Sequence, residues 1–407
     1  MRALVLDGNE NQAVAATRSL ARAGYRVSVG ASEGWSKAGW SRAASASFTY
    51  PHPGDDPDGF VRALVAELKK NGAAVVLPMT ERSTIPVSLH RQAITEVGGK
   101  LVLPPHEVLL QVFDKSGMTS LAESLGIAVP RSWVVDDATD ISALASSLPY
   151  PVVLKPNVSQ KRSEDGRSAP TGAPLYAKSA AEFANAIASM RTRSDSILVQ
   201  EFVLGDGAGY FALMQHGELR GEFAHRRIRD VRPTGSGSAL RESVTPSVAL
   251  RDGSLALLRA VGWHGVAMVE YRVRGDGTPV FLEVNGRFWN SLALAVHAGV
   301  DFPLGVAQLA EHGEVKPLAA GIPGIRARWL LGDLRHLAAV LRGAPTGYPV
   351  KFPSRLATTL AVLTPSVGTR HDNFALGDPL PELGDFIHFF GRKLPAALIG
   401  KLRGKGE

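Results

Sequence analysis

Short apolar runs alternate with amphipathic segments in the first hundred residues, and this alternation constrains the fold more than any other feature of the chain. The apolar runs cover 3–6, 26–29, 73–77 and 100–103. Amphipathic segments end at Gly24 and Gly72, as helices capped by glycine do. Alternating strands and helices indicate a mostly parallel, doubly wound sheet. We therefore expect an α/β domain at residues 1–110.

The pattern changes after Phe113 to helices and strands in mixed order, which predicts α+β units. A polar segment rich in Gly, Ser and Pro at 157–174 is expected to be a mobile loop. Two antiparallel hairpins should follow, one turning at His216–Gly217 and the other about Asp276. Beyond residue 310 the sequence is less periodic, and we place it only as a C-terminal appendage. A chain of 407 residues fits two or three domains.

The second hairpin carries polar side chains on one face of a probable strand. Glu283, Asn285 and Arg287 are two residues apart, so they share a face, whereas Leu282 and Val284 are expected to point the other way. A carboxylate, an amide and a guanidinium on one side of an apolar strand suggest a binding site.

A turn about Asp276 would place Glu270 nearly opposite Glu283. Like charges directly opposite each other destabilise a sheet unless a cation compensates them. With Asn285 these acids form an all-oxygen set, which is the kind of ligand that Mg²⁺ prefers. The alternative is a solvent-exposed strand face with coincidental acids, and Glu-x-Asn alone would favour that alternative.

Three further residues make sense if Mg²⁺ holds a nucleotide. Lys155 ends an apolar strand just before the polar loop and Lys115 begins a helix, so both could reach phosphate. Glu201 ends a buried strand, where its carboxylate could meet an adenine edge. In isolation Lys155 is better explained as an ordinary charged residue at the end of a strand. Lys115 is a poor partner for the helix dipole at an N-terminus, which favours a functional reason. The loop at 157–174 could fold over phosphates.

Four segments in this order resemble the ATP-grasp superfamily of carboxylate–amine and carboxylate–thiol ligases. They are FDKSG (113–117), YPVVLKP (150–156), LVQEFVLGDG (198–207) and VAMVEYR…VFLEVNGRFWNSLALAVHAGVDFP (266–303). The resemblance implies a pre-ATP-grasp α/β domain at 1–110 and an ATP-grasp domain of two α+β subdomains. The small subdomain with the phosphate loop would cover 111–195, the large subdomain with the metal site 196–310, and the appendage 311–407.

The resemblance also implies roles for single residues. The matching residues are Lys115 and Lys155 for the ATP phosphates; Glu201, Phe202 and Val203 for adenine; Asp206 for ribose; Glu270, Glu283 and Asn285 for Mg²⁺ or Mn²⁺; and Arg287 for the transferring group.

The stretch AHRRIRDVRPTGSGSALRES resembles the substrate-side strand and loop of carbamoyl-phosphate-synthase-like and D-aspartate-ligase-like members. By that resemblance Arg226, Arg227 or Arg241 could bind an anionic substrate, and Arg227 is our candidate catalytic residue. A solvated basic strand is the equal alternative. No lysine lies in a biotin-accepting context, which disfavours a carboxylase.

The resemblance implies an ATP-dependent ligase that joins a small-molecule carboxylate to an amine, and family members are often homodimers. The alternative is an ATP-binding scaffold of the same fold without ligase chemistry, or a membrane-peripheral scaffold that uses the basic tail. The net charge of +7 alone would allow nucleic acid as a partner, but the chain has no recognition motif for it. The basic tail 392–407 is more simply a solvated end than a peripheral lipid contact.

The first residues, MRALVLDGNENQ, have too short an apolar run and too early an acid to be expected as a signal peptide. The sequence has no apolar run long enough to span a membrane, and it contains no cysteine. The absence of cysteine excludes disulfides and a thiolate nucleophile, and it fits a reducing compartment. These features predict a cytoplasmic protein.

Overall fold

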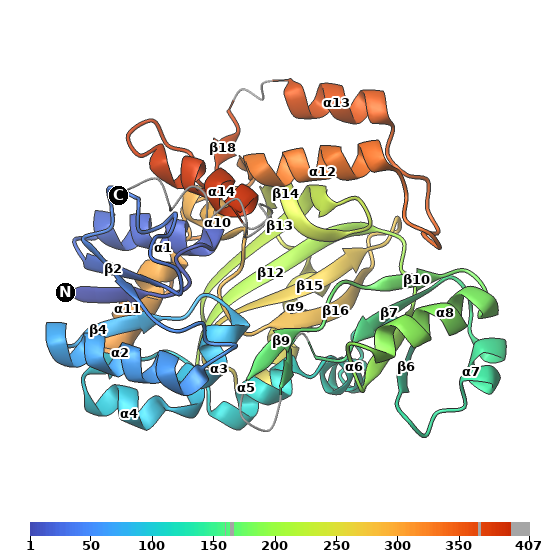
Figure 1. The fold of residues 1–407 in the computed structure, drawn as a ribbon, viewed down its shortest axis with the longest axis horizontal. Helices are drawn as coiled ribbons and strands as arrows, with labels where there is room; N and C mark the ends of the chain where they lie inside the picture. The colour runs from blue at the N-terminus through green and yellow to red at the C-terminus, as the bar shows by residue number, and fades with distance from the viewer. Residues whose placement is uncertain (159, 163–166, 365–367, 392–407) are drawn as a thin grey trace, which may run out of the picture.

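The computed structural model describes residues 1–158, 160–162, 167–364 and 368–391 (Figure 1). Its N-terminal sheet has the order β3-β2-β1-β4-β5, and all neighbouring strands are parallel. The strands are β1 (Arg2–Val5), β2 (Arg26–Ala31), β3 (Ala46–Thr49), β4 (Ala74–Leu77) and β5 (Gly99–Lys100). The expected parallel sheet is therefore confirmed, although the mostly exposed β3 lacked an apolar run to reveal it.

Helices cover both faces of this sheet, because alternate strand residues are apolar on each side. Ala3 and Val5 join a core shared with α1, α10 and α11, whereas Leu4 and Leu6 pack with α2. The helices of this region are α1 (Asn11–Arg22), α2 (Pro57–Asn71), α3 (Glu81–Leu89), α4 (Arg91–Glu96) and α5 (His106–Phe113). The much later α10 (Leu292–His297) and α11 (Phe302–His312) complete the packing against α1.

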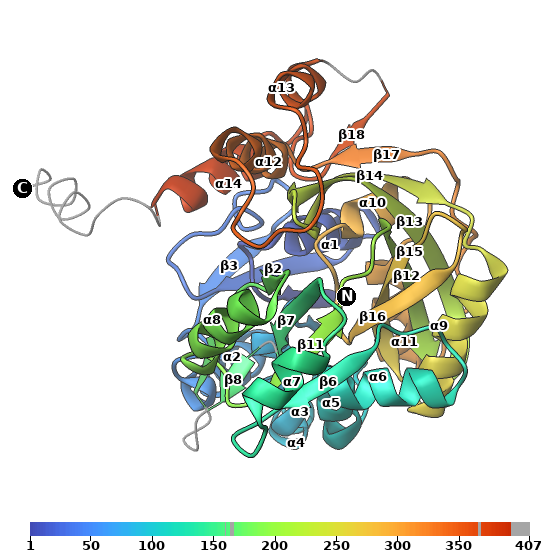
Figure 2. The ribbon, with the colours of Figure 1, turned by 90° about the vertical axis from the view of Figure 1, so that its right-hand side faces the viewer.

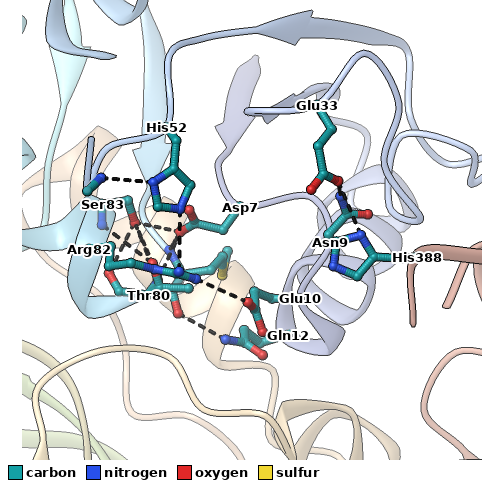
Figure 3. Close-up of polar contacts among 12 residues, drawn as sticks. Asp7, Asn9, Glu10, Gln12, Glu33, His52, Thr80, Arg82, Ser83 and His388 are labelled. Atoms are coloured by element: carbon teal, nitrogen blue, oxygen red, sulfur yellow. Dashed lines mark hydrogen bonds and ion pairs between the residues drawn. The ribbon is translucent and has the colours of Figure 1, made fainter. Parts of the chain in front are cut away.

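A polar cluster closes the carboxyl ends of these strands (Figure 3). Asp7, directly after β1, accepts hydrogen bonds from the backbone N–H groups of Met79 and Thr80 at 3.1 and 3.0 Å. Its carboxylate also accepts one from Ser83 Oγ at 2.5 Å. The contacts tie β1 to the start of α3 and leave a cavity of about 40 Å³. That volume is far below the roughly 300 Å³ or more of typical ligand pockets.

The second sheet is antiparallel and has the order β10-β7-β11-β6. Its strands are β6 (Ser132–Val135), β7 (Val152–Pro156), β10 (Leu175–Ala177) and β11 (Ile197–Glu201). The accompanying helices are α6 (Lys115–Ser124), α7 (Ile141–Ser147) and α8 (Ala180–Arg191). Phe183 and Ile187 of α8 bury the apolar face of this sheet with Val152 and Val199.

The polar segment 157–174 is not wholly a loop. Its described residues include a two-stranded antiparallel ribbon of β8 (Gln160–Arg162) and β9 (Ser168–Pro170). Residues 159 and 163–166 of the same segment lie outside the described residues.

The third sheet has the order β16-β15-β12-β13-β14-β17-β18. Its first five strands are β12 (Asp206–Gln215), β13 (Glu218–Arg232), β14 (Ser236–Val244), β15 (Gly265–Val273) and β16 (Pro279–Asn285), with α9 (Val248–Ala260) between β14 and β15. Both expected hairpins are confirmed. His216 and Gly217 have φ of 50° and 83°, the positive values that a two-residue hairpin turn of type I′ requires.

The segment expected only as an appendage completes this large sheet. β17 (Arg326–Arg328) pairs with β14, and β18 (Arg370–His371) pairs with β17. Three helices lie beside this edge, namely α12 (Leu330–Arg342), α13 (Arg355–Leu363) and α14 (Leu380–Gly391) (Figure 1). The basic tail 392–407 lies outside the described residues. Within the described chain, every helix is too short or too polar to cross a lipid bilayer.

Helix α14 docks against the N-terminal region through buried polar contacts. Lys37 Nζ lies 2.7 Å from Asp385 Oδ1, and Arg18 Nε lies 2.9 Å from Asp378 Oδ2. Asn373, just before α14, donates a hydrogen bond to Asn11 Oδ1 at 2.9 Å. The two ends of the described chain are thereby joined.

Glu382 makes this docking sensitive to pH. Burial, and then Asp385 and Asp372, raise its pKa from 4.5 to about 7 against the opposing effect of Lys37 and Arg18. Between these two pH values the unfolded chain gives up the proton that the folded chain retains, so stability falls as pH rises. Glu382→Gln should therefore increase the free energy of unfolding by about 3 kcal/mol at pH 8 and change it little at pH 4.5. Urea unfolding at both pH values measures this, and equal shifts would contradict it.

Candidate active site

A cavity of about 720 Å³ lies between the small sheet and the large sheet. It is lined by nearly all of the site residues expected from the sequence, namely Lys115, Lys155, Glu201, Phe202, Val203, Arg227, Glu270, Glu283, Asn285 and Arg287. Asp206 is the exception: it is exposed and does not line the cavity, so the ribose contact expected of it finds no support.

The two acids of the second hairpin face each other as their spacing predicted. Glu270 on β15 pairs directly with Glu283 on β16. Asn285 lies on the same cavity wall, and its Nδ2 is 3.4 Å from Glu283 Oε1. Two carboxylates and an amide oxygen in one cavity are a hard, all-oxygen donor set, and this set fits Mg²⁺.

A β-bulge changes one detail of this strand. The register shifts between Glu270 and Tyr271, so that two residues of β16 stand opposite one residue of β15. Leu282 consequently lines the cavity beside Glu283, whereas Val284 is buried in the core behind it. The expectation that Leu282 would point away from the site was wrong, because a strict two-residue period does not survive a bulge.

Two lysines, one at the start of α6 and one on β7, keep Glu283 ionised. Burial alone would raise the pKa of Glu283, but Lys115 and Lys155, followed by Asn285 and Arg287, hold it below its usual value. Burial lowers the pKa of Lys155, and Glu283 partly offsets that effect. Lys155 Nζ donates a hydrogen bond to Gln200 Oε1 at 2.9 Å. The carboxylates and lysines of the two sheets therefore share one electrostatic environment.

Arg287 is fixed at the end of β16. Its Nη2 donates to Asn285 Oδ1 at 2.9 Å and its Nη1 donates to the carbonyl of Phe288 at 2.8 Å. These two bonds hold the guanidinium beside the oxygen-rich wall, where it can meet charge that develops on a reacting group.

Arg227 reaches the same wall from β13. Its Nη2 lies 2.9 Å from Glu270 Oε1, and its Nη1 lies 3.6 Å from Asp230 Oδ1. Burial would lower the pKa of Arg227, but Glu270 and Asp230 overcome this and raise it. In this structure the guanidinium therefore serves as the counter-ion of Glu270.

The other two arginines considered for anion binding do not line the cavity. Arg226 pairs with Glu242 at the surface, and Arg241 is fully buried beside Asp372. Adjacent residues of a strand point to opposite faces, so Arg226 and Arg227 could not both face the site. The expectation for Arg226 and Arg241 was wrong.

Two glycines of β12 leave room for these side chains. A Cβ at Gly207 would lie 2.7 Å from Arg227 Cδ, and one at Gly209 would lie 3.1 Å from His225 Nε2. Strand β12 runs between β13 and β15, so the absence of side chains at these positions lets Arg227 cross it to Glu270.

Gly207→Ala is expected to displace Arg227 from Glu270 and to destabilise the fold by about 1–3 kcal/mol, the usual cost of overpacking. Urea unfolding measures this change. Gly275→Ala is the matched control, because a Cβ at that hairpin turn meets nothing within 4 Å and its φ is not in the left-handed region. Equal stability of the two variants would show that Gly207 does not hold this path open.

The hinge strand β11 leads into an aromatic cluster supplied partly by the C-terminal segment. Phe202 makes edge contacts with Tyr176 and Tyr348 at centroid distances of 6.1 Å each. The carboxylate of Glu201 is already held by Arg131 at 2.9 Å, and Arg274 lies 3.5 Å away. Tyr348, in the stretch between α12 and α13, also lines the cavity. No motif or periodicity around Tyr348 predicted this contribution.

His225, Trp289 and Ser291 also line the cavity, and they were not predicted as site residues. His225 is buried, and burial together with Arg227 and Arg241 lowers its pKa well below the usual value, so it is neutral. Ser291 Oγ lies 3.4 Å from its Nδ1. Within the described chain, His225 Nε2 and Trp289 Nε1 have no hydrogen-bond partner. Trp289 and Ser291 continue the two-residue spacing of Glu283 to Arg287, and that spacing was an available signal.

The described part of the polar segment approaches the cavity as well. Thr171 and Gly172 line it, and Thr171 Oγ1 donates to the carbonyl of Val158 at 2.9 Å. Closure of the segment over phosphate remains a prediction.

Comparison with solved structures gives matches over most of the chain. An L-amino acid ligase from Bacillus licheniformis matches with a TM-score of 0.58 and 15% identity over 78% of this chain and 77% of that chain. A biotin carboxylase from Campylobacter jejuni matches with a TM-score of 0.62 and 15% identity over 80% of this chain and 74% of that chain. A third match is the biotin carboxylase domain of the Hydrogenobacter thermophilus 2-oxoglutarate carboxylase, which was solved with MgADP and bicarbonate. Its TM-score is 0.60, with 14% identity over 80% of this chain and 72% of that chain.

No protein-family model and no curated protein matches the sequence. The structural matches cover about four fifths of the chain. At 14–15% identity the matches show a shared architecture, and this architecture is the one that the sequence motifs predicted. The chain has the ATP-grasp fold.

Proposed function

We propose that the chain is an ATP- and Mg²⁺-dependent ligase that joins a carboxylate to an amine through an acyl phosphate. The observation that carries the proposal is the pairing of Glu270 with Glu283 inside a cavity that also contains Lys115 and Lys155. Facing carboxylates destabilise a sheet unless cations compensate them. A fold that retains such a pair beside two lysines has the parts needed to hold a metal and a triphosphate.

The cavity has a surplus of positive charge. Its acidic lining residues are Glu201, Glu270 and Glu283, and its basic ones are Lys115, Lys155, Arg227, Arg232, Arg272, Arg287 and Lys351. A nucleotide triphosphate together with an anionic second substrate would balance this surplus. The surplus supports the assignment of an anionic carboxylate as the phosphoryl acceptor, with Arg227 and Arg287 near it.

Glu270, Glu283 and Asn285 would hold Mg²⁺, or Mn²⁺ in its place, which supplies charge neutralisation for the phosphates. Lys115 at the start of α6 and Lys155 on β7 would add to that neutralisation. The backbone of Phe202 and Val203 and the carboxylate of Glu201 would hold adenine at the hinge, although Glu201 must then be shared with Arg131.

The substrate carboxylate attacks the γ-phosphorus, an oxygen–phosphorus bond forms, and ADP leaves. The amine then attacks the carbonyl carbon of the acyl phosphate, loses a proton, and displaces phosphate. Arg287 stabilises the negative charge that develops on the carbonyl oxygen. Exclusion of water by the segment at 157–174 would protect the acyl phosphate from hydrolysis.

The test is ADP release by the purified protein with MgATP against pools of carboxylates, each with a pool of amines or with hydroxylamine. Hydroxylamine traps an acyl phosphate as a hydroxamate, so its formation would support the intermediate directly. The same protein carrying Glu283→Gln serves as the background. ATP binding without ADP release stimulated by any pool would instead favour the non-catalytic ATP-binding scaffold.

Bicarbonate is included as a separate acceptor, because two of the matched structures are biotin carboxylases. ADP release with bicarbonate but with no amine would redirect the proposal to carboxylation. We further propose the division into units at 1–110, 111–195, 196–310 and 311–407, a cytoplasmic location and a homodimeric assembly. Size-exclusion chromatography with light scattering tests the assembly.

A further inference from the structure

Exposed apolar side chains are concentrated on the C-terminal helices. On α13, Leu356, Leu360 and Leu363 are 71%, 59% and 66% exposed. Their spacing of four and three residues puts them on one face of this nine-residue helix, whereas Thr358 and Val362 are buried. Single exposed leucines are ordinary, but a stripe of three on a short helix marks an interaction surface.

Helix α14 repeats the arrangement. Its exposed apolar residues are spaced by three, four and three positions along one face, namely Leu380, Leu383, Ile387 and Phe390. Its opposite face is buried. The two ribbon views place α12, α13 and α14 together along one edge of the molecule (Figure 1, Figure 2).

The exposed charge beside these stripes is positive. Arg342, Arg355 and Arg370 are exposed, and none of them forms an ion pair within the described residues. The acids of 341–391 are turned inward instead: Asp372 contacts Arg241, Asp378 contacts Arg18, Asp385 contacts Lys37, and Glu382 is buried. Apolar stripes flanked by unpaired cations, with no exposed acid, complement a negatively charged, apolar partner.

We propose that the leucine stripe of α13 and the apolar stripe of α14 dock on the surface of an anionic lipid bilayer. The apolar side chains would enter the boundary between headgroups and acyl chains, and the arginines would meet lipid phosphates. The chain that continues beyond α14 carries five basic residues and one acid, so its charge has the same sign. The proposal does not depend on the ligase activity.

A second copy of the chain fits these stripes less well. A two-fold interface brings the same patch of each copy together, so the positive charges of Arg342, Arg355 and Arg370 would meet the equally positive patch of the other copy. No exposed acid of 341–391 is available to compensate them. Like charges across an interface oppose association.

The test is co-sedimentation of the full chain with phosphatidylcholine vesicles that contain or lack phosphatidylglycerol. Binding is expected only with phosphatidylglycerol, and it should weaken as salt is added. Leu356→Ser, Leu360→Ser and Leu363→Ser combined should weaken it roughly tenfold or more, because the apolar insertion is lost. The matched control is Leu89→Ser, Leu125→Ser and Val248→Ser, three exposed apolar residues elsewhere on the surface.

Two further variants of the full chain complete the test. Arg342→Gln with Arg355→Gln should weaken binding to phosphatidylglycerol vesicles, and thermal unfolding of each variant checks that the fold persists. Failure of the wild type to bind these vesicles would overturn the proposal, as would unchanged binding of the triple-serine variant. A further variant replaces Lys401, Arg403 and Lys405 with Gln. If only this variant loses vesicle binding, the proposal is overturned, because the basic tail and not the helical stripes would then bind the lipid. A dimer dispersed by the triple-serine change would overturn it in favour of a second copy.

Discussion

Replacing Glu283 with Gln is expected to lower the turnover of substrate-stimulated ADP release by roughly 10³-fold, since a metal site supplies several kcal/mol of charge stabilisation and each 1.36 kcal/mol corresponds to a factor of ten. The reason lies in the pair that Glu283 forms with Glu270. Glutamine keeps the shape of the side chain but removes the charge that Lys115 and Lys155 stabilise. The remaining set of one carboxylate and two amides is a weaker ligand for a hard cation.

The fold should survive this change, because glutamine keeps the shape of the side chain and the relief of repulsion from Glu270 offsets part of the lost attraction to Lys115 and Lys155. Thermal unfolding should show at most a modest loss of stability for Glu283→Gln, because the attraction to Lys115 and Lys155 is lost. Partial rescue of turnover is expected at high Mg²⁺ concentration. Glu218→Gln is the matched control on an exposed end of β13 and should keep wild-type turnover. Near-normal turnover of Glu283→Gln would remove the metal assignment, and loss of the folded state would attribute the effect to structure.

Replacing Arg287 with Met is expected to lower turnover by about 10²–10³-fold, the usual effect of removing one preorganised donor to a developing oxyanion. The structure holds this guanidinium by bonds to Asn285 and the carbonyl of Phe288, so it needs no rearrangement to act. Nucleotide affinity should change much less than turnover, because Arg287 is assigned to the transferring group and not to adenine or ribose. Steady-state kinetics with nucleotide titration separates the two effects.

Two companion variants sharpen this test. Arg287→Lys keeps the charge but loses the planar fork, so it should recover only part of the lost turnover. Arg259→Met changes an exposed arginine on α9 and should leave turnover unchanged. A large loss of nucleotide affinity in Arg287→Met with turnover preserved would place Arg287 in the nucleotide site.

Regular patterns explain why much of the fold could be predicted from the sequence. The hairpin that joins Glu270 to Glu283 has apolar runs on both strands and a polar turn with two glycines, so the pairing of these two acids followed from counting outward from the turn. Likewise the parallel N-terminal strands are fully buried apolar runs at β1 and β4, where composition alone marks a strand.

Features that depend on contacts distant in sequence could not be predicted. The β-bulge brings Leu282 to the cavity wall, and the pattern of apolar and polar residues along the strand does not predict a bulge at that position. Arg241 looked like a member of a basic cluster, but its partner Asp372 is 131 residues away and buries it. Tyr348 reaches the hinge from a segment without periodicity.

The joining of the two chain ends has a consequence for biosynthesis. Asn11 and Lys37 leave the ribosome early, yet their hydrogen-bonding partners Asn373 and Asp385 are made almost at the end of translation. The ion pair of Lys37 with Asp385 and the hydrogen bond from Asn373 to Asn11 can form only after more than three hundred further residues have been added, so the nascent N-terminal sheet lacks these contacts until then. Full stability is reached only on chain release, and ribosome-stalled intermediates of this protein should be unusually dependent on chaperones.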